Sequence, residues 1–155
     1  MRPAPTHISP ASVDTIPVVV ELMRQYWEFE QIRGFSAQHA ERLLQSFFSQ
    51  PQLGRGWIAY SEQDVLGYML CSCVFSFEYG GMAAAIDELY VVAESRGQGV
   101  GRLLVEHAEA QMRDLGCIHI EMEVAARNVR AQRFYSLLGF ATRAGYSMMH
   151  KPLSP

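Results

Sequence analysis

Apolar residues recur at helical spacing in two segments near the start of the chain. The first segment carries Val18, Leu22, Tyr26 and Phe29. The second carries Ala40, Leu43, Leu44, Phe47 and Phe48. Ser12 or Asp14 can cap the first helix and Ser36 the second, because such side chains accept hydrogen bonds from the free N–H groups of a first helical turn. Pro51 and Gly54 end the second helix.

The pattern then changes to alternation, which is typical of strands. Residues 56–60 and 65–77 predict a hairpin, and the pair Gly80-Gly81 predicts the next turn. That turn leads into an apolar run at 86–92. A short first strand is expected at 6–9, before the first helix.

The second half of the chain alternates between helical and strand patterns. A helix is predicted from Val100, a strand at 117–124, a helix from Asn128 to Gly139 and a final hairpin at 140–151. The helix from Val100 has a buried stripe of Val100, Leu103, Leu104, Ala108, Met112 and Leu115. In this strand, the side chains expected to point inward are those of Ile118, Ile120, Met122 and Val124. The order βααβββαβαββ predicts an α/β three-layer sandwich, with a mixed central β-sheet and helices on both faces.

Length and composition suit one soluble domain. The 155 residues, 49% of them apolar, predict a single domain at 1–155. A formal net charge of −3 gives no reason to expect nucleic acid or an anionic membrane as a partner. Cys71, Cys73 and Cys117 are odd in number and lack C-x-x-C spacing, so neither a disulfide framework nor a metal site is expected. No segment is typical of a signal peptide or a membrane span, and a cytoplasmic setting is expected.

The six residues 96–101 read RGQGVG and lie between the apolar run and the helix from Val100. Glycines at alternate positions remove side chains from a strand-to-helix turn, so that backbone N–H groups can face a ligand. The first turn of the helix adds free donors, and Arg96 adds a positive charge, which together predict an anion site. The spacing is neither G-x-G-x-x-G, since residue 102 is Arg, nor a P-loop, since no Gly-Lys-Ser/Thr triplet occurs.

The pattern R-x-x-G-x-G after a strand resembles the pyrophosphate-binding signature of the GNAT N-acetyltransferases, which bind acetyl-CoA. Asn128 to Phe140 is similar to the family's N-x-x-A-x-x-F-Y-x-x-x-G-F element, and residues 86–91, IDELYV, resemble its acidic strand. The three motifs stand in the family's order. They look most like the branch that acetylates polyamines and other small amines, and the resemblance implies the family's fold.

The resemblance also assigns acetyl-CoA contacts. The strand that pairs with the pantetheine amides corresponds to Leu89, Tyr90 and Val91. The pyrophosphate loop corresponds to Arg96, Gly97, Gln98, Gly99, Val100, Gly101 and Arg102. The later helix adds Asn128, Ala131 and Tyr135, although Asn128 is equally a good helix cap. Ala93 stands where the family often has proline, which changes the stiffness of the turn.

Acetyl transfer to an amine requires a base, because a free alkylamine has a pKa near ~10 and is mostly protonated at neutral pH. Asp87 and Glu88 are the candidates. By its position in the motif, Asp87 resembles the acidic residue that the polyamine branch uses, directly or through water, and Glu88 resembles a second acid that often accompanies it. As neighbours on a strand they are expected to point to opposite faces, so that only one looks into a given cleft. Each alone could instead be a solvated edge residue or part of a salt bridge. His119 is a remote alternative base.

The departing thiolate requires a proton, and Tyr135 is the candidate general acid. By itself, a tyrosine at this position reads more simply as a buried residue with a satisfied hydroxyl, and the motif around it favours the catalytic role. Residues expected to wall the acceptor site are Trp27, Glu28, Phe77 and Glu78, together with Asp87. Aromatic and acidic groups suit an amine, although each of these residues could equally be core or rim.

The resemblance therefore implies an acetyl-CoA-dependent enzyme that acetylates a primary amine of a small molecule by direct attack. Two alternatives remain at this point. The acceptor could be a protein lysine or N-terminus, or the chain could be a non-catalytic acyl-CoA-binding module. A homodimer is expected, with the first two helices or the final hairpin as its interface.

Overall fold

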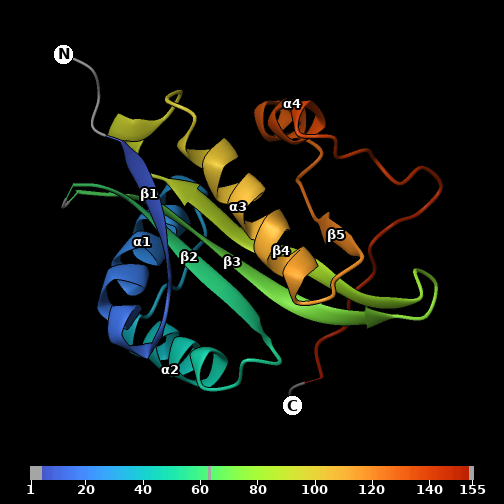
Figure 1. The fold of residues 1–155 in the computed structure, drawn as a ribbon, viewed down its shortest axis with the longest axis horizontal. Helices are drawn as coiled ribbons and strands as arrows, with labels where there is room; N and C mark the ends of the chain where they lie inside the picture. The colour runs from blue at the N-terminus through green and yellow to red at the C-terminus, as the bar shows by residue number, and fades with distance from the viewer. Residues whose placement is uncertain (1–4, 63, 154–155) are drawn as a thin grey trace. The chain divides into compact units, whose positions relative to one another are not determined.

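The computed structural model describes residues 5–62 and 64–153, which fall into two compact units divided after Glu123. The larger unit contains a five-stranded sheet in the order β1-β2-β3-β4-β5 (Figure 1). Its strands are β1 Thr6–Pro10, β2 Gly54–Ser61, β3 Asp64–Ser76, β4 Gly81–Val91 and β5 His119–Met122. The first four pair antiparallel and β5 pairs parallel to β4, so the sheet is mixed, as predicted.

Helices cover both faces of this sheet. Helices α1 (Ile16–Phe29) and α2 (Ala37–Phe48) pack on one face and α3 (Val100–Asp114) on the other (Figure 1). Neighbouring residues of β2 show the two faces, because successive side chains of a strand point in opposite directions. Ile58 joins the core formed with α1 and α2, whereas Trp57 packs its ring 6.1 Å from that of His107 on α3. The predicted α/β sandwich is confirmed.

Local signals set the helix starts. The Ser36 hydroxyl accepts a hydrogen bond from the His39 N–H at 3.2 Å and caps α2, as expected. Ser12 instead caps a 3₁₀ turn, Val13–Thr15, that leads directly into α1. Within the residues that the structure describes, no helix combines the length and apolar character needed to cross a membrane.

The smaller unit holds helix α4, Val129–Leu137, which Asn128 caps by accepting the Ala131 N–H at 3.0 Å. The predicted final hairpin is wrong, because residues 140–151 contain no strand and are mostly exposed. Tyr146 and Met149 remain 66% and 89% exposed. A strand-like pattern indicates only that a segment suits a half-buried surface. A strand also needs a neighbouring strand to pair with, and residues 140–151 have none in the structure.

The strand expected at 117–124 is also shorter than predicted. β5 covers only His119–Met122, and the side chain of Ile118, expected to point inward, is 60% exposed. Val124 is likewise exposed, and it begins the smaller unit. The alternation therefore continued past the residues that pair with β4. The predictions of one domain and of a homodimer stay predictions.

Candidate active site

The centre of β4 carries a β-bulge at the acidic pair. Leu70 pairs with Glu88 and Cys71 with Ile86, so Asp87 has no opposite residue on β3. Leu70 and Cys71 point to opposite faces, which places Ile86 and Glu88 on opposite faces too. In a regular strand those two residues would share a face. The sequence argument that assigned Asp87 and Glu88 to opposite faces assumed unbroken alternation, and the bulge removes that basis.

Glu88 lies on the face covered by α1 and is held by groups from two other elements. The Tyr68 hydroxyl of β3 donates to Glu88 Oε2 at 2.5 Å, and the Tyr68 side chain is 0% exposed. The Trp27 side chain of α1 also hydrogen-bonds the carboxyl group. A buried carboxylate needs such donors, because desolvation without compensation is costly.

Burial sets the proton affinity of this cluster. Desolvation raises the pKa of Glu88 above its ordinary value, and the charge of Asp87 adds to the rise, while the hydrogen bonds from Tyr68 and Trp27 oppose it. Burial likewise raises the pKa of Tyr68 far above its usual range and that of Tyr26 to about 12. Both phenols therefore stay neutral at physiological pH, and Glu88 is the carboxyl of this cluster whose proton affinity burial raises.

Asp87 differs from its neighbour. Its side chain is exposed, whereas Glu88 is half-buried. The charge of Asp87 nevertheless reaches the cluster, since it contributes to the raised pKa values of Glu88, Tyr68 and Tyr26. The structure thus distinguishes a half-buried, hydrogen-bonded carboxyl at Glu88 from an exposed one at Asp87.

After the bulge, β4 presents an open edge. Its pairing with β5 covers only residues 83–86, so among the described strands none pairs with residues 87–91 on that side. The Val92 N–H donates to the Leu66 carbonyl of β3 at 2.9 Å. Main-chain groups of a strand alternate in direction, which turns those of Leu89 and Val91 toward the open edge. Pairing with pantetheine amides, which the family resemblance implies for Leu89 to Val91, would need free main-chain groups of this kind, and it stays a prediction.

The glycine loop continues from this edge into α3. Gly97 and Gly99 have φ of 76° and 85°, which side chains rarely tolerate, and a Cβ on either would meet nothing within 4 Å. The backbone therefore faces open space. Gly99 is the N-cap of α3 and has no side chain to occupy the free donors of the first turn. This cradle fits a diphosphate, which needs N–H donors, a positive dipole end and close approach.

Arg96 makes contacts that its position in the loop did not predict. Its Nε donates to the Val91 carbonyl at 3.0 Å, and its guanidinium lies 4.0 Å from the ring centre of Phe29 and 5.4 Å from that of Tyr90. The side chain thus joins the loop to the end of α1. It takes one of the carbonyls on the open edge that the sequence assigned to pantetheine.

The other long side chains of the loop bond locally. Gln98 Nε2 donates to the Glu94 carbonyl at 2.8 Å, and Arg102 forms an exposed ion pair with Glu106 at 2.7 Å. Val100 is buried at the start of α3. A phosphate contact from Gln98 or Arg102 stays a prediction.

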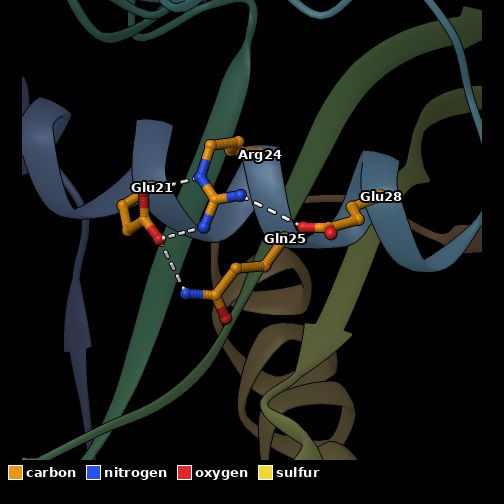
Figure 2. Close-up of polar contacts among 4 residues, drawn as sticks. All are labelled: Glu21, Arg24, Gln25 and Glu28. Atoms are coloured by element: carbon orange, nitrogen blue, oxygen red, sulfur yellow. Dashed lines mark hydrogen bonds and ion pairs between the residues drawn. The ribbon is translucent and has the colours of Figure 1, made fainter.

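Of the five residues expected to wall the acceptor site, the four other than Asp87 lie in different environments. Trp27 reaches Glu88, but Glu28 turns to the outer face of α1, where it accepts from Arg24 at 3.1 Å (Figure 2). Arg24 also binds Glu21 on that face, and this contact lowers the pKa of Glu21 to about 2. Phe77 is 93% exposed and Glu78 is exposed, both between β3 and β4.

The smaller unit holds the last group of expected residues. Tyr135 is buried on α4, with its ring 4.9 Å from that of Phe134 and 5.4 Å from that of Phe140. Asn128 acts as a helix cap through its side-chain oxygen. The roles of Asn128, Ala131 and Tyr135 toward acetyl-CoA stay predictions.

Sequence reasoning missed Tyr68, and it did not foresee the contact between Phe29 and Arg96. Tyr68 reads as one apolar position of a strand, and its partner Glu88 lies across a hairpin whose register the bulge shifts. Phe29 reads as the last apolar position of a helix. Pairing the predicted strand at 65–77 with the acidic strand at 86–91 would have brought Tyr68 close to Glu88, and no sequence signal links Phe29 to Arg96.

Comparisons with known proteins agree with this arrangement. The sequence profile of the acetyltransferase (GNAT) family matches residues 18–140. A peptidyl-lysine N-acetyltransferase of Escherichia coli (strain K12) is 34% identical over 101 residues, which are 64% of this chain and 56% of that protein. The match thus spans little more than half the length of that relative.

Two further proteins are similar over most of their length. An aminoglycoside N(6')-acetyltransferase type 1 of Acinetobacter haemolyticus is 23% identical over 137 residues, or 86% of this chain and 90% of that protein. The crystal structure of a possible acetyltransferase from Clostridium difficile 630 has a TM-score of 0.85 at 14% identity, covering 97% of this chain and 99% of that one. That likeness shows the fold.

Proposed function

Because the chain belongs to the acetyltransferase (GNAT) family, we propose that it transfers an acetyl group from acetyl-CoA to a primary amine of a small molecule. The observation that carries the proposal is the half-buried carboxyl of Glu88, with its raised pKa and its two hydrogen-bond donors, beside an open strand edge and a glycine cradle. Family membership and the profile match at 18–140, which spans parts of both units, also support one domain at 1–155.

Acetyl-CoA supplies the acetyl group as an activated thioester. The free N–H groups at the start of α3 and the backbone at Gly97 and Gly99 would hold its diphosphate. The open edge of β4 at Leu89 would accept the amide groups of the pantetheine arm by strand-like pairing. Holding the donor still in this way supplies the orientation that a bimolecular transfer requires.

Glu88 is the proposed base. An alkylammonium acceptor is mostly protonated at neutral pH, so a group of matched pKa must take the proton before the nitrogen can attack. The raised pKa of Glu88 brings it closer to that task than an exposed carboxylate such as Asp87. Asp87 and the aromatic rings of Tyr26 and Trp27 would favour the cationic acceptor before it loses the proton.

Direct attack is favoured over a covalent enzyme intermediate. Burial raises the pKa of the Cys71 thiol to about 12, so it stays protonated, and a thiol is a poor nucleophile compared with its thiolate. Tyr135 is the proposed donor of the proton to the departing sulfur. This role is supported by the motif from Asn128 to Phe140.

A second candidate acceptor is a lysine side chain of a protein, because the Escherichia coli relative is a peptidyl-lysine acetyltransferase. The Acinetobacter relative, by its name, acts on an aminoglycoside, which is a small molecule. Both acceptors present a primary amine, so the chemistry assigned to Glu88 is the same for either. A non-catalytic acyl-CoA-binding module would not need a buried proton acceptor.

The test measures thiol release from acetyl-CoA against polyamines, aminoglycosides, amino acids and lysine peptides. We expect turnover with at least one small amine and a higher kcat/KM than with any peptide. Turnover with peptides alone would transfer the proposal to a protein acceptor. Tight binding of acetyl-CoA without turnover on any amine would contradict the proposal.

A further inference from the structure

We propose that Tyr68 is a positioning residue of this transfer, whose hydroxyl holds the carboxylate of Glu88 ionised and oriented for the acceptor amine. The inference rests on the proposed role of Glu88. Neither the sequence motifs nor the family match assigns a function to this tyrosine.

The geometry makes Tyr68 a fixed donor. Tyr68 pairs with Tyr90 across the β3–β4 ladder and Glu88 pairs with Leu70, so Tyr68 and Glu88 are diagonal neighbours on one face. The Tyr68 ring is fully buried in the core with α1 and α2, which restricts it to one position. Its hydroxyl lies 2.5 Å from Glu88 Oε2, within the range of a strong O–H···O⁻ hydrogen bond.

The charges around Glu88 explain why the carboxylate needs this donor. The groups that face the cluster are Tyr68 on β3, Asp87 on β4, and Tyr26 and Trp27 on α1, with Glu30 near Tyr26. Burial and Asp87 both favour the protonated form of Glu88, while Tyr68 and Trp27 favour the ionised form. The raised pKa of Tyr68 keeps it a proton donor at every working pH.

Two substitutions at position 68 change the donor in opposite directions. Tyr68→Phe keeps the ring and removes the hydroxyl, so the pKa of Glu88 rises. The acid limb of the kcat/KM profile should then shift to higher pH by about one pH unit. Replacing Tyr68 with 3-fluorotyrosine makes the hydroxyl a stronger donor and should shift that limb to lower pH. This analogue also keeps the test informative if Tyr68→Phe fails to fold.

Two controls separate positioning from packing. Tyr60→Phe removes a hydroxyl from the neighbouring strand β2, where the ring stacks on His7 at 5.4 Å, and should keep the wild-type profile. In a Glu88→Gln background, Tyr68→Phe should leave the pH profile unchanged, because the group that it tunes is absent. A purely structural role of Tyr68 would lower activity evenly at all pH values.

Carbon-13 NMR of the Glu88 carboxyl, in the free full-length protein, measures the same pKa without turnover. The proposal is supported if the Glu88 pKa shifts in opposite directions in the two variants and the acid limbs of their kcat/KM profiles shift in the same way. An unchanged Glu88 pKa in both variants overturns it, whatever the protein catalyses. A shifted Glu88 pKa with unmoved limbs overturns it too, by showing that Glu88 is not the base, and that result also removes the proposed role of Glu88.

Discussion

The bulge of β4 and the loop that follows it present different chemical groups. At the bulge, the Glu88 side chain is half-buried and held by Tyr68 and Trp27. In the loop, Gly97 and Gly99 expose the backbone because side chains are absent. One region has a carboxyl of perturbed pKa, and the other offers N–H groups that do not titrate.

The two regions suit two different requirements of acetyl transfer, which are moving a proton and holding the donor. Moving a proton requires a group whose pKa is shifted by burial, whereas holding a diphosphate requires fixed donors that are open to solvent. Arg96 joins the two regions, since it leaves the loop and stacks on Phe29 at the end of α1. Substitutions at the bulge should therefore change the chemical step, and substitutions in the loop should change donor affinity.

The largest effect is expected from Glu88→Gln. Loss of a general base typically costs 10²–10⁴-fold in rate, and kcat should fall on that order. The matched control, Asp87→Asn, removes an exposed charge and should lower kcat on the order of tenfold or less, because that charge acts on Glu88 only through space. Steady-state kinetics at pH 7.5 compares the two, and a greater loss in Asp87→Asn would transfer the role of base to Asp87.

Tyr135→Phe should have the next largest effect. It keeps the packing of the ring against Phe134 and Phe140, and it removes the proposed proton donor. We expect kcat to fall by on the order of 10²-fold, with little change in acetyl-CoA affinity. A rise in KM at constant kcat would make Tyr135 a binding residue instead.

Gly101→Ala should weaken acetyl-CoA binding while it stabilises the fold. Gly101 lies inside α3, where alanine is favoured over glycine by roughly 0.5–1 kcal/mol, so the melting temperature should rise. Its Cβ would nevertheless obstruct a diphosphate at the helix start, and acetyl-CoA should bind on the order of tenfold more weakly. Calorimetric titration measures this, and unchanged affinity would remove Gly101 from the diphosphate site.

Arg96 tests the link between the two regions. A cation–π contact at a partly exposed site is worth about 0.5–1 kcal/mol, and Phe29 is 53% exposed. Arg96→Ala and Phe29→Ala should therefore each lower the free energy of unfolding, with a coupling of about that size in the double variant. Additive losses in urea unfolding would show that the stacking has no energetic role.

The smallest effect concerns stability and pH. The folded-state pKa of Glu88 is raised, so between the unfolded and folded pKa values the native state binds more protons, and stability falls as pH rises through that window. Glu88→Gln removes this cost, and it should melt higher than wild type at pH 8 by about 2–4 °C for each kcal/mol relieved. At pH 4 the two proteins should melt alike. An equal difference at both pH values would assign the effect to packing.

The sequence predicted the loop better than the bulge, and the reason is range along the chain. The glycines, the strand before them and the helix after them are consecutive, so their local pattern is sufficient. The environment of Glu88 combines β3, β4 and α1, and the bulge that shifts their register has no mark of its own in the sequence. The expectation of opposite faces for Asp87 and Glu88 therefore loses its basis where the bulge interrupts β4.

The predicted end of the chain shows a related limit. The run with Tyr146, Met148 and Met149 is apolar and was expected in a hairpin, yet these side chains are exposed and belong to no strand. In contrast, the caps Ser36 and Asn128 were predicted correctly, because a cap depends on residues within one turn. Sequence rules therefore predict an element correctly when the residues that it contacts are close to it in the sequence.

We expect the bulge to perform the chemistry and the loop to hold the acetyl donor. Saturation kinetics in acetyl-CoA, at a fixed and saturating amine, compares Glu88→Gln with Gly101→Ala. We predict a low kcat with a wild-type KM for Glu88→Gln, and a raised KM with a near-wild-type kcat for Gly101→Ala. If both variants change the same parameter, the two regions do not divide the reaction in this way, and the account is wrong.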